Sequence, residues 1–185
     1  MRLILVTCLA AALSLAPAQA GSKMETAGKA VAISLPIIAA GITAYKHDWE
    51  GTAQLFVTTA LTVGTAYGLK HLVRECRPFA KPCTPGDGNW DSFPSDTTAL
   101  AAAPAGFLWQ RYGWQYGAPA LLATGFVGWS RVDAKQHHWW DTVASLGIAV
   151  AYNEIFTTQY HEGRGFYSSL DGDPEGVYAS VGYRW

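Results

Sequence analysis

The chain has 185 residues, of which 50% are hydrophobic and 13% aromatic, and its formal net charge is -1. This composition excludes an intrinsically disordered chain, and the length suffices for one domain with its own hydrophobic core. A net charge near zero provides no overall positive field for nucleic acid, so we expect no nucleic-acid partner. Any site for an anion must be assembled locally.

The N-terminal segment has the pattern of an export signal. Arg2 supplies a positive charge, residues 3–15 form an apolar run, and residues 18–20 (Ala-Gln-Ala) fit the small-x-small pattern that precedes a cleavage site. We therefore predict a signal peptide over residues 1–20, with the mature chain beginning at Gly21. An uncleaved first membrane helix is the alternative for the same segment.

Uncharged stretches rich in Ala and Leu follow, joined by short polar segments, and their lengths are typical of packed helices. They cover Ala30–Tyr45, Thr52–Leu69, Thr97–Gln110, Tyr112–Ser130 and Thr142–Asn153. The sequence thus predicts an all-α domain over residues 21–160, a bundle of about five to six helices. A bilayer span needs about 20 apolar residues, and only the second and fourth stretches approach that length. An integral bundle and one resting on the membrane both fit.

The last segment, residues 161–185, differs in character because glycines interrupt it. Residues 177–183 alternate loosely and indicate an extended strand. We predict an irregular or short extended tail there.

After signal removal, two cysteines remain, Cys76 and Cys83, on either side of a short loop. Export to an oxidising compartment permits a disulfide between them. Such a bridge would brace the segment that holds Arg77. Two unpaired thiols are the alternative.

The first two of three polar clusters contain groups that bind anions. Lys70 is followed by Arg77-Pro78, a pattern that by itself indicates only a basic helix end. Ser95 and Asp96 precede an Ala-rich stretch, where either residue fits a helix N-cap. A helix N-terminus also offers free backbone N–H groups to an anion, so both interpretations of this cluster are compatible.

The third cluster combines Arg131, His137 and Asp141. Arginine can bind two phosphate oxygens at once. The spacing of His137 and Asp141 places them on one face of a helix, where the carboxylate can fix the imidazole tautomer and stabilise the imidazolium. The alternative is an interfacial stretch, because Trp139 and Trp140 suit a boundary between water and an apolar phase.

Together the three clusters read Lys-x6-Arg-Pro, Pro-Ser and Ser-Arg-x5-His-x3-Asp. This order resembles the signature of the PAP2 (phosphatidic acid phosphatase type 2) superfamily, which includes lipid phosphate phosphatases, bacterial acid phosphatases and vanadium haloperoxidases. The resemblance spans Lys70 to Asp141. It implies that His137 forms a phosphohistidine, that Asp141 orients it, and that the phosphate is held by Lys70, Arg77, Ser95 and Arg131. It implies no metal and no other cofactor.

The second cluster departs from the family pattern. The family usually has Pro-Ser-Gly-His, with Asp replacing Gly in some members, whereas this chain has Pro-Ser-Asp-Thr at residues 94–97. Thr97 therefore stands where the family has the histidine that protonates the leaving oxygen, and loss of a general acid typically costs about 10²–10⁴ in rate. Asp96 and His71 are the candidate substitutes.

The leading interpretation is a metal-independent phosphatase that acts on a phosphomonoester or a diphosphate, carried by a small molecule or by a lipid. A second interpretation is a phosphate-binding or structural envelope protein that lost catalysis at Thr97. A third is a vanadium-dependent haloperoxidase. We expect the protein in the bacterial cell envelope, either in the periplasm or in the inner membrane with a periplasm-facing site, and membrane association is compatible with all three.

Overall fold

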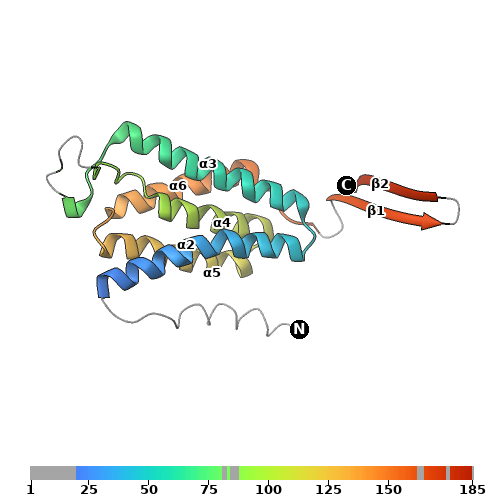
Figure 1. Cartoon of the computed structure of the whole chain (residues 1–185), viewed down its shortest axis with the longest axis horizontal. Coiled ribbons are helices and arrows are strands. Elements are labelled where there is room, and N and C mark those ends of the chain that lie inside the picture. Colours follow the sequence, from blue (N-terminus) through green and yellow to red (C-terminus); the bar gives the residue numbers. More distant parts are fainter. Residues whose placement is uncertain (1–19, 81–82, 84–87, 162–164, 174–175, 185) are drawn as a thin grey trace.

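The computed structural model describes residues 20–80, 83, 88–161, 165–173 and 176–184, so the predicted signal peptide lies outside the described residues apart from Ala20. Within this part of the chain five α-helices form a bundle (Figure 1), which confirms the predicted all-α fold. The helices are α2 (Ala20–Tyr45), α3 (Trp49–Val73), α4 (Asp96–Tyr112), α5 (Trp114–Asp133) and α6 (Trp139–Phe156), and a short 3-10 turn, η1 (Pro78–Ala80), follows α3.

Each helix extends beyond the uncharged stretch that predicted it at one end or both, because polar residues form caps and terminal turns, although α5 begins two residues later than its stretch. Asp48 caps α3 and accepts a hydrogen bond from the Gly51 N–H, while Lys70 lies in the last turn of the same helix. Ser95 caps α4 and accepts from the Thr98 N–H. Residues of the first two polar clusters therefore lie at helix ends, where unpaired backbone groups are available.

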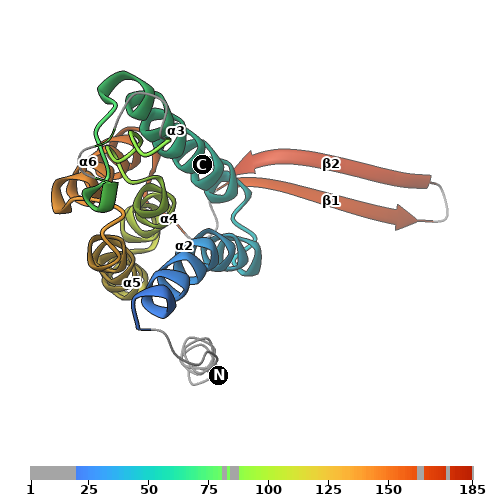
Figure 2. The ribbon, with the colours of Figure 1, turned by 60° about the vertical axis from the view of Figure 1, so that its left-hand side comes forward.

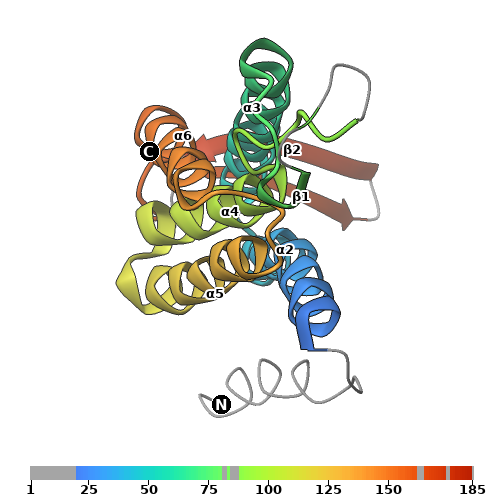
Figure 3. The ribbon, with the colours of Figure 1, turned by 90° about the vertical axis from the view of Figure 1, so that its left-hand side faces the viewer.

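Helix α4 lies at the centre of the bundle and contacts each of the other four helices (Figures 2 and 3). Its central turns are built from fully buried alanines, which allow neighbouring helices to approach closely. They are Ala99, Ala101, Ala102, Ala103 and Ala105. Because α4 begins at Asp96, this packing fixes the second polar cluster against the other helices.

One end of the bundle gathers the start of α2, the connection between α3 and α4, and the turn between α5 and α6 (Figure 1). Helix α2 lies directly against α5 there, since a Cβ atom at Gly28 would overlap the Ser130 hydroxyl. All three predicted clusters come from these segments, and they therefore meet at this end.

The C-terminal segment forms a β-hairpin that projects from the other end of the bundle (Figure 2). Strand β1 (Gly165–Asp173) pairs antiparallel with β2 (Gly176–Arg184), from Gly165 opposite Arg184 to Asp173 opposite Gly176. The sequence predicted one extended segment there, and the structure adds β1 as its partner. Pairing satisfies backbone N–H and C=O groups that a single strand would leave open.

Among the described helices, one is long and apolar enough to cross a membrane, over Lys23–Tyr45 of α2, and only 28% of its apolar window is buried. The sequence had favoured the second and fourth stretches. The difference arises because α2 begins at Ala20, ten residues before the uncharged stretch that predicted it. Length and composition alone are weak evidence for a membrane-spanning helix. A second observation is that the apolar side chains of Ile33 and Ile37 in α2 are more than half exposed.

Candidate active site

His137 lies in the turn between α5 and α6, and its side chain is 97% buried, with 3% exposed. Its Nδ1 atom is 2.7 Å from the Ser92 carbonyl oxygen and 3.5 Å from Asp141 Oδ2. A carbonyl oxygen only accepts hydrogen bonds, so Nδ1 must carry the proton. The neutral ring then has its lone pair on Nε2, the nitrogen that can act as a nucleophile.

The pairing of His137 and Asp141 differs from the predicted one in geometry. Helix α6 begins only at Trp139, so His137 precedes the helix and Asp141 lies in its first turn. The two side chains meet across the N-terminus of α6 rather than along one helical face. The Ser92 carbonyl, which no sequence pattern indicated, makes the closer contact to the imidazole.

The electrostatic surroundings keep this imidazole neutral and its partner ionised. Burial lowers the pKa of His137, and the positive charges of Lys70 and Arg77 lower it further, against the opposing effect of Asp141. Burial acts to raise the pKa of Asp141, but hydrogen bonds with His137 and Ser92 outweigh it and hold that pKa below its usual value. At neutral pH the pair is therefore a neutral base beside a carboxylate.

Only one of the two carboxylate oxygens of Asp141 accepts hydrogen bonds from the described residues. Its Oδ2 atom accepts hydrogen bonds from the Ser92 hydroxyl at 2.6 Å and from the His138 N–H at 2.8 Å. Its Oδ1 atom is buried and has no hydrogen-bond partner among the described residues. A fully buried carboxylate with a free oxygen is costly, which indicates that a further group belongs there.

Lys70 comes from the last turn of α3 and is buried. Its ammonium group donates to the carbonyl oxygens of Asp91 and Pro94, at 2.6 and 3.1 Å. It also lies 3.2 Å from Asp96 Oδ2, at the start of α4. The first and second clusters are thus in direct contact.

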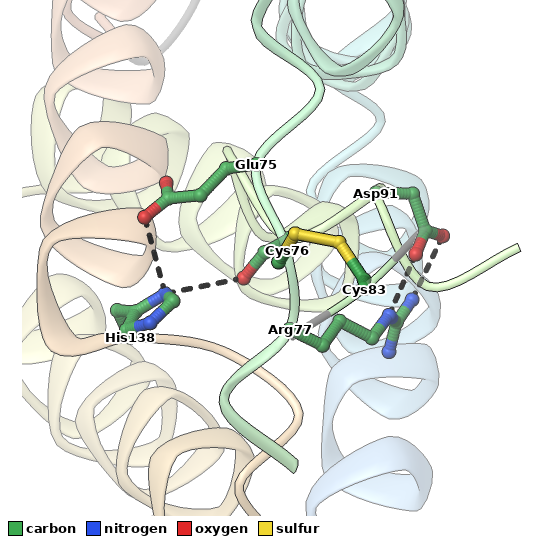
Figure 4. Close-up of a disulfide and its surroundings, with 7 residues drawn as sticks. Glu75, Cys76, Arg77, Cys83, Asp91 and His138 are labelled. Atoms are coloured by element: carbon green, nitrogen blue, oxygen red, sulfur yellow. Dashed lines mark hydrogen bonds and ion pairs between the residues drawn. A yellow bond between two sulfur atoms is a disulfide. The ribbon is translucent and has the colours of Figure 1, made fainter. Parts of the chain in front are cut away.

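Arg77 follows Cys76 in the connection after α3. It donates to both carboxylate oxygens of Asp91, at 2.6 and 2.8 Å, and its third nitrogen contacts Gln136 Oε1 in the α5–α6 turn. The arginine hydrogen bonds lower the pKa of Asp91 despite its partial burial. Cys76 and Cys83 form the predicted disulfide, with their Cα atoms 5.9 Å apart, directly beside this pair (Figure 4).

Arg131 lies near the end of α5 and is buried. One terminal nitrogen donates to Glu25 Oε1 of α2 at 3.0 Å, whereas its Nε atom is buried without a hydrogen-bond partner in the described part of the chain. A buried guanidinium N–H that lacks an acceptor is suited to an anionic ligand.

Each predicted phosphate-binding cation therefore has a carboxylate partner. The pairs are Lys70 with Asp96, Arg77 with Asp91, and Arg131 with Glu25. An entering phosphate must share or displace these carboxylates. Sequence reasoning missed Glu25 and Asp91 as partners; Asp91 adjoins the second cluster, but Glu25 and Arg131 lie 106 positions apart and no local pattern connects them.

The second cluster is arranged around a buried Ser95. Its hydroxyl oxygen accepts from the Thr98 N–H and the Thr98 hydroxyl, at 3.3 and 3.0 Å, so its own proton remains to be donated. Asp96 Oδ1 is buried without a hydrogen-bond partner among the described residues, and Thr97 is partly buried. His71 is exposed, and its ring contacts the Tyr67 carbonyl oxygen of its own helix at 2.8 Å.

A hollow of about 520 Å³ lies at the opposite end of α4, lined in part by Lys46, Trp109, Arg111, Tyr112 and Tyr160. None of the predicted site residues lines it. The Lys46 ammonium group already lies over the rings of Tyr112, Tyr116 and Tyr160, at 5.2 to 5.5 Å from their centres. We therefore place the chemistry at the other end, where the polar clusters meet.

The chain is similar to known proteins of one family. The family model described as the PAP2 superfamily matches residues 51–164, more than half of the chain. The lipid A 4'-phosphatase of Helicobacter pylori is 31% identical over 150 residues, which cover 77% of this chain and 74% of that protein. No solved structure matches the chain significantly. The motif order, the helical bundle and these two matches together show that the chain belongs to the PAP2 superfamily.

Proposed function

We propose that this protein is a phosphatase of lipid-linked phosphates that acts through a phosphohistidine at His137. The observation that carries the proposal is the hydrogen bond from His137 Nδ1 to the Ser92 carbonyl, because it leaves the Nε2 lone pair free. Nε2 would attack phosphorus while the bond to the leaving oxygen breaks, and water would then cleave the phosphorus–nitrogen bond to release phosphate. Asp141 would stabilise the positive charge on the ring.

Three cations support charge stabilisation in the same reaction. Lys70, Arg77 and Arg131 are fixed by helix ends and by the disulfide-braced segment, so once the phosphate has replaced the carboxylates the cations themselves need little movement when charge develops on the phosphoryl oxygens. Preorganised charges of this kind are often the largest contribution to catalysis. The phosphate would take over contacts that Asp91, Asp96 and Glu25 now make.

The leaving oxygen also needs a proton, and here the chain departs from its family. Thr97 cannot act as an acid at neutral pH, and His71 is exposed and engaged with its own helix. Asp96 is the better candidate by position, since it lies within 3.2 Å of Lys70 at the site and one of its oxygens is buried without a hydrogen-bond partner among the described residues. Substrates with good leaving groups, such as diphosphates, would depend least on this proton.

A lipid substrate is supported by two observations. The Helicobacter pylori relative is a lipid A 4'-phosphatase. The bundle surface also carries exposed apolar side chains, with large aromatic residues near both ends, an arrangement found in proteins that contact the membrane interface. These aromatic residues are Trp129, Trp139 and Trp140 at the site end and Tyr45, Trp49, Trp109 and Trp114 at the other. We accordingly propose that the protein is associated with the membrane of the bacterial envelope.

The test is phosphate release by purified protein from a series of aryl, diphosphate and alkyl phosphates of rising leaving-group pKa, with lipid-linked and soluble members. We expect good leaving groups to be cleaved fastest. Thr97→His should raise kcat/KM for alkyl esters by up to about 10²–10⁴ and change good leaving groups little, whereas Asp96→Asn should slow the alkyl esters further. Equal rates for aryl and alkyl esters in the wild type would show that a general acid is already present.

A second function is favoured by Thr97 itself, namely phosphate binding without catalysis. It would be supported if neither the wild type nor Thr97→His released phosphate while both bound vanadate, a phosphate analogue. Trapping of labelled phosphate on His137 during turnover would contradict it.

A further inference from the structure

Glu75, His138 and Asp141 form a separate group of possible metal ligands, the Glu75 group. Glu75 and His138 lie close to the disulfide between Cys76 and Cys83 (Figure 4). His138 Nδ1 lies 3.3 Å from Glu75 Oε1 and 3.5 Å from Asp141 Oδ2. One ligand atom from each residue lies within 4.8 Å of the other two. The phosphate chemistry proposed above uses Asp141 but neither Glu75 nor His138.

The spacing of these atoms matches the coordination shell of a small metal ion. A tetrahedral ion with ligand bonds of about 2.0–2.1 Å separates its ligands by about 3.3–3.4 Å. The two measured separations, 3.3 and 3.5 Å, lie at this value and are long for hydrogen bonds. One imidazole and two carboxylates also form the nitrogen–oxygen set that zinc accepts in sites with three protein ligands.

The local charge balance points the same way. Lys70, Arg77 and Arg131 are each engaged with other carboxylates, and among the described residues the ion-pair partner of Glu75 is His138. Asp141 is fully buried; its Oδ1 atom lacks a hydrogen-bond partner in the described chain, while its Oδ2 atom, which faces His138, accepts from the Ser92 hydroxyl and the His138 N–H. A divalent cation held between these two carboxylates and the imidazole would balance their charge.

We propose that Glu75, His138 and Asp141 bind a divalent cation of the zinc class and that this ion inhibits the phosphatase. Asp141 Oδ2 lies 3.5 Å from the Nδ1 atom of His137 and 3.5 Å from that of His138, so one oxygen serves both clusters. An ion bound there neutralises the carboxylate that would stabilise a positive charge on His137. The proposed binding of the metal ion does not depend on the proposed function, whereas the proposed inhibition rests on it.

Binding is tested first, on tag-free protein stripped with a chelator. Zinc titration against a fluorescent zinc indicator should give one site per chain, and Co²⁺ should give the visible absorption of a tetrahedral centre. Glu75→Gln, which still offers an acceptor to the Trp140 N–H, should weaken zinc binding by more than about tenfold. His138→Gln should do the same, while Glu154→Gln, at an exposed position on α6, should bind like the wild type. Melting temperatures confirm that each variant is folded.

Unchanged affinity in both Glu75→Gln and His138→Gln, or an octahedral Co²⁺ spectrum, would overturn the site. In the activity assay, zinc should inhibit the wild type at the concentration that fills the site and should inhibit Glu75→Gln only at more than about tenfold higher concentration. A filled site without inhibition would overturn the regulatory role. Protein with no phosphatase activity at all would contradict the proposed function, while the binding measurements would still decide the metal site.

Discussion

The two ends of the bundle both bury ion pairs, but they satisfy them differently. At the far end Arg111 donates from Nε to Asp48 at 2.8 Å and from Nη1 to the Thr158 carbonyl at 3.0 Å, while the Tyr112 hydroxyl donates to Asp48 at 2.6 Å. At the site end Arg131, Asp96 and Asp141 each retain a buried polar atom that has no hydrogen-bond partner among the described residues.

This difference separates a structural ion pair from the ion pairs of the proposed site. An unsatisfied buried polar group costs about 1–3 kcal/mol, so selection for stability alone would remove several of them in one place. The far end has the complete network expected of a structural brace between α3, α4 and the segment after α6. At the site end, a buried donor on Arg131 and buried acceptors on Asp96 and Asp141 lack partners among the described residues, as expected where a ligand completes the network.

The largest expected effect comes from His137→Asn. The asparagine N–H can replace the hydrogen bond to the Ser92 carbonyl, so the fold should be retained, but the nucleophilic nitrogen is lost. We expect kcat to fall by about 10⁴ or more, with little change in melting temperature. Phosphate-release kinetics and thermal unfolding measure the two quantities. Substantial residual turnover would place the nucleophile elsewhere.

Asp48→Asn should show the opposite behaviour. It leaves the buried Arg111 with only the more distant Glu50 carboxylate, at 3.9 Å, and breaking a buried pair typically costs about 3–5 kcal/mol. Denaturant unfolding should reveal the loss of stability, while kcat at low temperature should stay within about twofold of the wild type. A variant with wild-type stability but impaired turnover would overturn the division between the two ends.

Arg131→Ala should weaken vanadate binding by about 10- to 100-fold, because a charge-assisted hydrogen bond is worth about 1.5–3 kcal/mol. Glu25→Gln is the matched partner, since it removes the carboxylate that competes for the same guanidinium. It should strengthen vanadate binding by a few-fold. Equilibrium titration measures both, and equal affinities in the two variants would contradict a role for Arg131 in the site.

The smallest effect concerns pH. Protonated His137 has no free Nε2 lone pair, so activity is lost as pH falls through the pKa of the folded protein. Because burial and the nearby cations lower that pKa, the acid limb of kcat/KM should lie below the ordinary histidine value of about 6.5. Asp141→Asn removes a group that raises the His137 pKa, so its residual activity should extend to still lower pH. An acid limb above 6.5 would be the contrary result.

Long uncharged stretches indicated the five helices, but most helix ends lie further out, because polar residues such as Asp48 form the caps. The sequence did predict the cap at Ser95, and it placed the start of α5 too early, at Tyr112 instead of Trp114. The order of the motifs predicted which cations gather. It could not predict that Glu25 would pair with Arg131, because that contact depends on how α2 packs against α5, nor that a backbone carbonyl would hold His137.

The close approach at Gly28 gives the N-terminal helix a further significance. Gly28 and Ser130 fix α2 against α5, and three residues earlier on α2 Glu25 holds Arg131. A slide of α2 by one residue corresponds to about 1.5 Å along its axis, a large fraction of an ion-pair distance. Membrane-spanning helices tilt to match the thickness of the bilayer. With α2 in a membrane, a change in bilayer thickness would therefore change the distance between Glu25 and Arg131 and weaken or strengthen their ion pair.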